Sequence, residues 1–417
     1  MATSGGVGIQ IQPNMASLDV DAALLRKGWS DKTYIEALQE EPLLKDANII
    51  ETVRAGKKPE ALPTASIVDV TPSGSGVKAD RSVTLQFLRA LDDVGGTGNA
   101  SSPLGNEETL RLKSATFYSN DWFHAVTSET YGIDFRELSP TKIYPQMPQL
   151  LKQWRGELEG HYMRSGVIET RSPNLTSAPL SLTQPLNPNW YIPGSTAQPT
   201  YDATAADHED SIGDALSGVT AGDCVLTASR ILTLGDYLEE HYIKPTIING
   251  MPLYRLYMHP DDIRFNLDPS QTGSWAAYFN SSAACKEINS VVPGSIGIIG
   301  DKMLCIRDPR CPTITVSGST ADWGLSIGYL KQGRNDTRTT GHTNNVHFNA
   351  NYVLGATALG KYVSEPDHFE EQKDVYNKIK AIAYIGAFGY GLINWDVDTP
   401  TDASMQSEGT FVVPTQR

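Results

Sequence analysis

The sequence lacks the features that mark a secreted, membrane-spanning or zinc-binding protein. No window approaches the ~20 consecutive apolar residues of a membrane span, and the first residues have neither the charged nor the apolar region of a signal peptide. We therefore expect no membrane partner. The cysteines occur without C-x-x-C spacing or nearby paired histidines, so we expect reduced thiols rather than zinc ligands or a disulfide framework. They are Cys224, Cys285, Cys305 and Cys311.

Common catalytic motifs are also absent. There is no G-x-S-x-G, H-E-x-x-H or Walker pattern, and the histidines are scattered singly. The glycine-rich residues 73–76 precede a predicted strand, whereas a phosphate-binding glycine loop opens a helix. Residues 207–210 (DHED) could suggest a metal site, but consecutive side chains diverge in a loop, which favours a solvated acidic surface. We expect no catalytic residue, no cofactor and no metal, and we infer a structural role.

Positive charge is in deficit, since 34 Lys and Arg stand against 48 Asp and Glu, for a formal net charge of -14. Binding to duplex phosphates needs a clustered basic face, so this balance argues against tight binding of DNA. The 36 glycines and 25 prolines are spread along 417 residues, which indicates many turns and few helices. A chain of this length exceeds one typical core, so we expect several domains or one body with long excursions.

Residues 81–126 have the pattern of a long β-hairpin. Ser82 and Thr84 alternate with Val83, Leu85 and Phe87 before the loop, as in a half-exposed antiparallel strand, and residues 109–126 predict the returning strand. The loop between them, residues 92–108, is rich in Gly, Ser, Asn and acids and is too polar to form a core. Such an arm has few contacts within its own chain, which favours support by a neighbouring subunit. An ordinary hairpin with a long surface loop is the alternative.

Two segments have the three- and four-residue spacing of amphipathic helices. Pro148 suits a first helical turn, and residues 148–164 predict a helix with one buried face. That face consists of Leu151, Trp154, Leu158 and Tyr162. Residues 224–242 predict a second helix that buries Ile231, Leu234 and Leu238. Shorter helices are expected over residues 18–25 and 32–38 and from about Ser274.

The remaining segments predict mainly strands and loops. Residues 253–258, 295–307 and 378–394 each predict a strand, and the small residues of 351–362 predict a helix. Residues 173–223 are rich in Ser, Thr, Pro, Asn and Asp, which is typical of an extended insertion or loop. His259 and Asp261 could form an acid–base pair, but capping of a short helix explains these turn residues more simply.

Eight landmarks, in order over residues 80–395, resemble the major capsid proteins of tailed phages, specifically the N-four-like podovirus group. The first four are SVTLQFLRAL, PLGNEETL, SNDWFHAV and LLKQWRGELE. The others are MPLYRLYMHPDDIRFNL with Trp275 after it, VVPGSIGIIGDKMLCIRD, NYVLGATALGKY and KIKAIAYIGAFGYGLINWD. The resemblance implies an α+β fold of the Hong Kong ninety-seven type.

That fold implies a division of the chain. Residues 1–80 would be an N-terminal arm and linker, 81–119 the extended loop hairpin, 120–223 the peripheral domain with its spine helix (148–164) and an insertion, and 224–417 mainly the axial domain with a return to the peripheral domain. Extra prolines before the spine helix suggest that it is shorter or kinked. Residues 173–223 and 317–347 are less familiar in this group.

The resemblance also implies a function. The chain would assemble with itself into hexamers and pentamers of an icosahedral shell around double-stranded DNA, with portal, scaffold and decoration proteins as further partners. It would assemble in the bacterial cytoplasm and end in the virion, without sequence-specific DNA binding. An encapsulin-like compartment shell is the first alternative, and an enzyme using His259 and Asp261 is the second. The intersubunit contacts would be made by the extended-loop residues Asp92, Asp93, Gly95, Gly98, Asn106, Glu107 and Glu108.

The extended loop also bears on how subunits are fastened. In the fold's namesake, a lysine on this loop joins an asparagine of a neighbouring subunit. No lysine lies between Asp92 and Thr109, and the nearest are Lys78 and Lys113. We therefore expect a shell that is held by charge and buried area rather than by covalent bonds.

Overall fold

The computed structural model describes residues 43, 49–54, 64–71, 82–88, 112–129, 147–168, 186–195, 198–199, 211–216, 218–219, 224–241, 243–267, 275, 292, 294–319, 322–328, 346–373, 379–395, 406–407 and 409–416. The described part divides into two compact units. The smaller contains residues 124–129, 147–152, 369–373 and 379–384, and the larger contains the rest. None of the described helices is long and apolar enough to cross a membrane.

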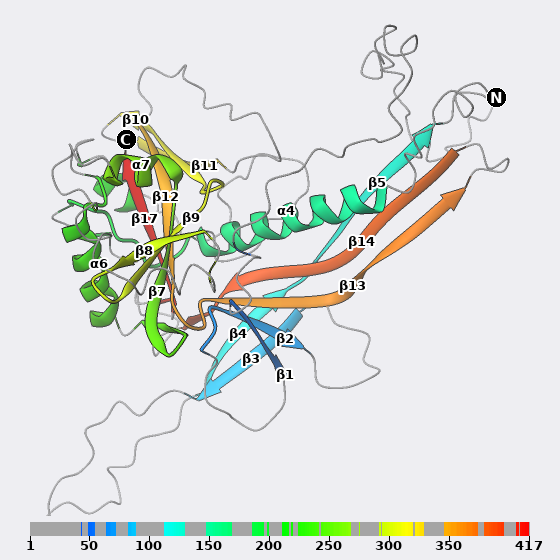
Figure 1. Cartoon of the computed structure of the whole chain (residues 1–417), viewed down its shortest axis with the longest axis horizontal. Helices are drawn as coiled ribbons and strands as arrows, with labels where there is room; N and C mark the ends of the chain where they lie inside the picture. Colours follow the sequence, from blue (N-terminus) through cyan, green and yellow to red (C-terminus); the bar gives the residue numbers. More distant parts are fainter. Residues whose placement is uncertain are drawn as a thin grey trace, which may run out of the picture. The chain divides into compact units, whose positions relative to one another are not determined.

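A five-stranded sheet has the order β1-β2-β13-β14-β5 (Figure 1). β1 pairs parallel with β2, and β2 pairs parallel with β13. Its strands are β1 (Ile50–Arg54), β2 (Ile67–Thr71), β13 (Leu359–Lys373), β14 (Ile379–Leu392) and β5 (Asn120–Glu129). β14 confirms the strand predicted over residues 378–394.

An eight-stranded sheet has the path β11-β10-β12-β7-β9-β8, to which β17 adds beside β12 and β6 beside β7. Its strands are β6 (Thr246–Ile248), β7 (Met251–Met258), β8 (Ser295–Ile299), β9 (Met303–Arg307), β10 (Thr313–Ser319), β11 (Asp322–Gly328), β12 (Val346–Leu354) and β17 (Thr410–Gln416). β7 confirms the strand predicted over residues 253–258. A short pair, β15 (Asn394–Trp395) with β16 (Gln406–Ser407), forms a separate ribbon.

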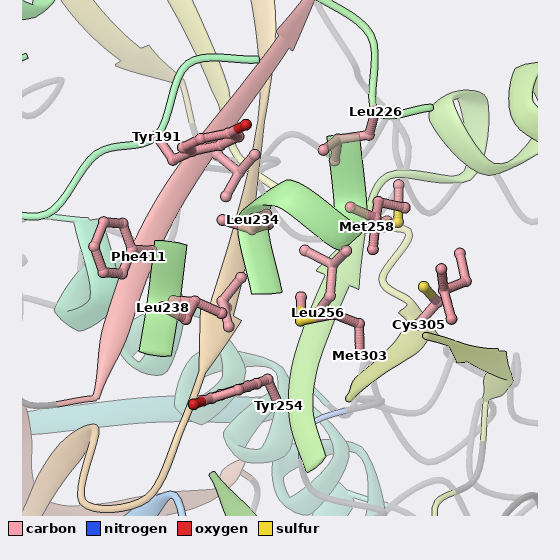
Figure 2. Packing of buried hydrophobic residues seen from close by; sticks show 14 of the residues in the cluster. Tyr191, Leu226, Leu234, Leu238, Tyr254, Leu256, Met258, Met303, Cys305 and Phe411 are labelled. Carbon is pink, nitrogen blue, oxygen red and sulfur yellow. The ribbon is translucent and has the colours of Figure 1, made fainter. Parts of the chain in front are cut away.

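Helix α6 (Ala228–Glu240) covers the eight-stranded sheet and confirms the second predicted helix, although it begins four residues after Cys224. The hydroxyl of Thr227 caps it by accepting a hydrogen bond from the backbone nitrogen of Arg230. The predicted face of Ile231, Leu234 and Leu238 is buried. Figure 2 shows this leucine face directed into a cluster that includes side chains of β7, β9 and β17. Apolar periodicity therefore placed this core correctly.

Residues 173–223 were predicted as an extended insertion or loop, and the part that the structure describes is largely irregular but contributes to the core. Residues 186–195 are largely irregular, but Trp190 and Ile192 are fully buried, and Trp190 bridges to Val412 of β17. Ile212 and Leu216, in a helical turn, belong to the same core cluster. A few large apolar side chains supply this burial, and Asn187 and Asn189 form hydrogen bonds with the buried backbone nearby.

The helix predicted over residues 351–362 is also wrong, because this segment is the end of β12 and the start of β13. Its small residues permit close packing between strands and loops. A Cβ at Gly355 would lie 2.6 Å from the carbonyl oxygen of Lys244, and Ala356 and Ala358 are buried. The strand predicted over residues 295–307 is two strands, β8 and β9, which pair antiparallel through a turn at Gly300 and Asp301 with positive φ.

The part of residues 317–347 that the structure describes consists of the end of β10, β11 and the start of β12, and β10 pairs antiparallel with β11. Other expectations lie outside the described residues. These are the helices over residues 18–25 and 32–38, the helix from about Ser274 and the acidic cluster at residues 207–210. Trp275 alone is described there, and it is fully buried.

Candidate assembly elements

The predicted hairpin is present, and its strands form a two-stranded sheet. β3 (Ser82–Leu88) pairs antiparallel with β4 (Leu112–Tyr118), from Ser82 opposite Tyr118 to Leu88 opposite Leu112. We call this pair of strands the hairpin root. The pairing confirms that the outgoing and returning strands of the hairpin lie side by side, and residues 89–111 connect them in the sequence.

The returning strand is shorter than the sequence predicts. Residues 109–126 were expected as one strand, but β4 ends at Tyr118, and β5 begins at Asn120 in another sheet. Burial shows the physical reason. Phe117 and Ser119 are buried two residues apart, whereas Asp121 is exposed and Trp122 is buried, so the alternation shifts by one residue between them.

The hairpin root is anchored on its own chain, contrary to the expectation of few such contacts. Its apolar face packs on β2 and β13 through a cluster of Val68, Val70, Leu85, Ala115, Phe117, Tyr362 and Ile393. A Cβ at Gly360 would lie 2.2 Å from two ring carbons of Phe117, so glycine lets the ring lie against β13. The root therefore has a fixed position on the five-stranded sheet.

The residues predicted to make intersubunit contacts lie outside the described residues. They are Asp92, Asp93, Gly95, Gly98, Asn106, Glu107 and Glu108. All of them belong to the segment that joins the two strands of the root, because β3 ends at Leu88 and β4 begins at Leu112. Their role stays a prediction.

The long helix α4 (Met147–Ile168) confirms the predicted helix and extends it by four residues past Arg164. Pro148 lies in its first turn, where a missing backbone N–H costs no hydrogen bond. Leu151, Leu158 and Tyr162 are buried as expected. Trp154 is only partly buried, so that prediction is wrong. Its ring lies 5.7 Å from the ring of Trp122.

Charged side chains on the buried face of α4 contact β13 and β14, and no sequence pattern predicted these contacts. The Glu159 carboxylate accepts hydrogen bonds from Lys361 at 2.7 Å, from the Tyr390 hydroxyl at 2.6 Å and from Arg155 at 3.0 Å. Burial acts to raise the pKa of Glu159, but Lys361 and Arg155 together hold that pKa below its ordinary value. Arg155 also donates to Asp367 at 3.0 Å. We call these four side chains and Tyr390 the helix–sheet network.

A second buried ion pair holds the C-terminal part of α4. Arg164 donates two hydrogen bonds of 2.7 Å to Asp308, a bidentate geometry in which both side chains are almost inaccessible to solvent. The Tyr352 hydroxyl donates to the same carboxylate at 2.7 Å. Burial acts to raise the pKa of Asp308, but Arg164 and these hydrogen bonds hold it below its usual range. The helix is thereby tied to the loop after β9 and to β12.

His259 and Asp261, the pair considered for an enzyme, cap helix α7 (Pro260–Leu267) as expected. The backbone nitrogen of Asp261 donates to Nδ1 of His259 at 3.2 Å, and that of Asp262 donates to the His259 carbonyl at 3.1 Å. Asp262 is buried and accepts hydrogen bonds from Thr415 at 2.7 Å and Asn351 at 3.0 Å. These contacts join α7 to β12 and β17, which is a structural task.

Within the described ranges, no group of three or more His, Cys, Asp or Glu is placed to hold a metal ion. Cys224, Cys305 and Cys311 are buried in the core, and none of these three forms a disulfide bond. Burial raises the pKa of the Cys224 thiol to about 12, so this thiol is protonated at neutral pH.

Among the comparisons with known proteins, the comparison of structures gives matches. No family model matches the sequence, and no curated protein matches it. The capsid of Ralstonia phage GP4 is similar with a TM-score of 0.58 at 13% identity, covering 100% of this chain and 98% of that one. The capsid asymmetric unit of cyanophage Pam1 gives 0.59 at 13% identity, with 94% and 96% covered.

A third similar structure is the acid-stable capsid of Helicobacter pylori bacteriophage KHP30, with a TM-score of 0.54 at 12% identity and full coverage of both chains. At identities this low, the similarity shows a shared fold alone. The likeness runs over nearly the whole of each chain. The chain therefore has the fold of bacteriophage capsid proteins, the Hong Kong ninety-seven-type α+β fold that the sequence resemblance predicts.

Proposed function

We propose that this chain is the major capsid protein of a tailed phage and assembles with itself into hexamers and pentamers of an icosahedral shell. The observation that carries the proposal is the likeness to three phage capsids over nearly full length. The buried ion pair of Arg164 with Asp308, the protonated thiol of Cys224 and the capping role of His259 agree with a structural protein. Portal, scaffold and decoration proteins are the further partners, and the mature location is the virion.

The extended loop is the proposed intersubunit contact. The loop joins the two strands of a root that is anchored by apolar packing, and its composition is too polar to add to the subunit's own core. Asp92, Asp93, Glu107 and Glu108 suit docking onto Lys or Arg of a neighbour. Exposed ion pairs are each worth only ~0–1 kcal/mol, so many copies and buried area must hold the shell.

The net charge of -14 suits a shell that encloses DNA without binding it tightly. A packaged genome must enter and leave, and negative groups repel phosphate over about a Debye length of ~8–10 Å. We therefore propose that the contact with DNA is confinement and not sequence recognition.

Replacing residues 95–106 with a short Gly-Ser turn tests the role of the loop. We expect a melting temperature close to that of the parent chain and a loss of closed particles in negative-stain images, because the loop lies beyond the root that the core holds. A second variant keeps the length of the loop but changes its four acids, Asp92, Asp93, Glu107 and Glu108, to Asn or Gln. It separates the effect of the loop's charge from the effect of its length. Normal shells from the shortened variant, or unfolding like a core deletion, would refute the assignment.

The absence of a loop lysine gives a second test of assembly. Particles boiled in detergent without reductant should run as single chains of about 45.4 kDa. A ladder of dimers to hexamers that resists heat and reductant would contradict fastening by charge and buried area.

A further inference from the structure

A partly buried carboxyl next to the helix–sheet network, that of Asp69, has one shielded oxygen. Asp69 of β2 lies directly opposite Lys361 of β13 in the parallel register. The Lys361 ammonium nevertheless contacts Glu159 of α4, at 2.7 Å. Among the described residues, the Oδ1 atom of Asp69 has no hydrogen-bond partner although it is shielded from solvent. A buried carboxylate oxygen in this state is costly unless it gains a proton or a donor.

The charges around this carboxyl do not balance. Three carboxylates, those of Asp69, Glu159 and Asp367, share two cations, Arg155 and Lys361. Both cations donate hydrogen bonds to Glu159, and Arg155 also donates to Asp367, whereas Lys361 acts on Asp69 through its charge alone. The groups that face Asp69 are Lys361 from β13, Glu159 from α4 and Tyr390 from β14. With every group ionised, this cluster carries one excess negative charge.

We propose that the Asp69 carboxyl is a proton-binding site, through which mild acid strengthens the attachment of α4 to the five-stranded sheet. Protonation removes the excess charge and supplies a hydroxyl donor at a shielded position. The proposal goes beyond the shell role and does not depend on it, because its test measures the folding of the chain itself.

The direction of the effect follows from linkage. Burial raises the pKa of Asp69 above 3.8, Lys361 opposes this shift and Glu159 adds to it. A carboxyl with a raised pKa in the folded state binds its proton more tightly there than in the unfolded chain. Its contribution to stability is therefore present at low pH and is lost as pH rises through the folded-state pKa. Asp367 and Asp262 have raised pKa values for the same reason, so the parent chain alone cannot isolate Asp69.

The Asp69→Asn variant isolates the site. Asn has nearly the same shape without the charge, so we expect its melting temperature to exceed that of the parent by about 1–3 °C at pH 7.5. The difference should shrink as pH is lowered from 7.5 to 4.5, because burial raises the pKa of Asp69, so the folded parent binds this proton more tightly than the unfolded chain does. The full chain is compared at equal concentration, with sedimentation confirming one assembly state throughout. Asp121→Asn, an exposed carboxyl on β5, is the matched control and should show no such pH-dependent difference.

A double-mutant cycle sharpens the test. In a Glu159→Gln background Lys361 loses its carboxylate partner and becomes available to Asp69, so Asp69→Asn should then lower the melting temperature at pH 7.5. A change of sign between the two backgrounds supports the proposal. The proposal is overturned if Asp69→Asn fails to fold at pH 7.5, or if its melting temperature differs from that of the parent by the same amount at both pH values.

Discussion

The two faces of β2 and β13 are built in opposite ways, although the same strands supply both. On one face, Val68, Val70 and Tyr362 pack against the hairpin root with apolar contacts. On the other, Lys361 forms an ion pair with Glu159 of α4, and Asp69 lies beside Lys361 in the parallel register. Strand alternation makes this possible, because consecutive side chains point to opposite sides of a sheet.

The difference indicates what each face contributes. Burial of apolar groups is non-directional and supplies stability roughly in proportion to the area removed from water. Buried ion pairs lose most of their Coulomb attraction to desolvation, but they are sensitive to geometry because a displaced charge is left unpaired. We infer that the hairpin face mainly stabilises the chain and that the helix face mainly fixes the position of α4.

The largest effect is expected where the apolar face is broken. Phe117→Ala should lower the free energy of unfolding by about 3–5 kcal/mol, since it removes a fully buried ring and leaves a cavity beside Gly360. Urea unfolding of the unassembled chain measures this cost. Tyr118→Ala is the neighbouring control, because that ring is 48% exposed, and it should cost much less. Equal costs would show that the root is not anchored as described.

An apolar residue on α4 tests whether the helix depends on its charges alone. Leu158 is 7% exposed, so Leu158→Ala should cost about 2–5 kcal/mol if the site does not collapse around the cavity. Leu150→Ala, on the same helix but 39% exposed, should cost little because Ala is a good helix former. Denaturant midpoints of the two variants decide this, and a negligible cost for Leu158→Ala would mean that its face is not buried.

Much of this arrangement can be predicted from sequence periodicity. Leu151, Leu158 and Tyr162 at helical spacing identified the buried face of α4, and alternation identified both strands of the hairpin root. These patterns arise from local geometry, which the sequence records directly. The resemblance to capsid proteins of tailed phages predicted the fold, and the structural similarity to phage capsids over nearly the full length supports it.

The contacts that join distant segments could not be predicted in the same way. Arg155 and Glu159 stand four residues apart on a helix, which suggests only a local pair, yet their partners Asp367, Lys361 and Tyr390 lie more than 200 residues away. The small residues of 351–362 led to a wrong helix prediction, because alanine and glycine permit close packing in sheets as well as in helices. The burial of Trp190 was not predicted, because a single large apolar residue gives no periodic pattern within a mainly polar segment.

The smallest effect is expected from one hydroxyl on the charged face. Tyr390→Phe removes the donor that lies 2.6 Å from Glu159, and hydrogen bonds to charged groups are worth about 1.5–3 kcal/mol. Glu159 keeps Lys361 and Arg155, so we expect a cost at the lower end of that range at pH 7.5. The Tyr390 hydrogen bond helps to hold the pKa of Glu159 below its ordinary value. The cost should therefore shrink as pH falls and Glu159 takes up a proton.

The chain contains a matched control for this prediction. Tyr162 lies on α4, is fully buried, and within the described part of the chain its hydroxyl has no hydrogen-bond partner. Tyr162→Phe removes a buried hydroxyl without breaking a bond, so it should be neutral or slightly stabilising at every pH. Urea unfolding at pH 7.5 and pH 4.5 compares the two variants. If Tyr390→Phe behaves like Tyr162→Phe, the charged face does not need this hydrogen bond, and the position of α4 must be set by its ion pairs and apolar contacts.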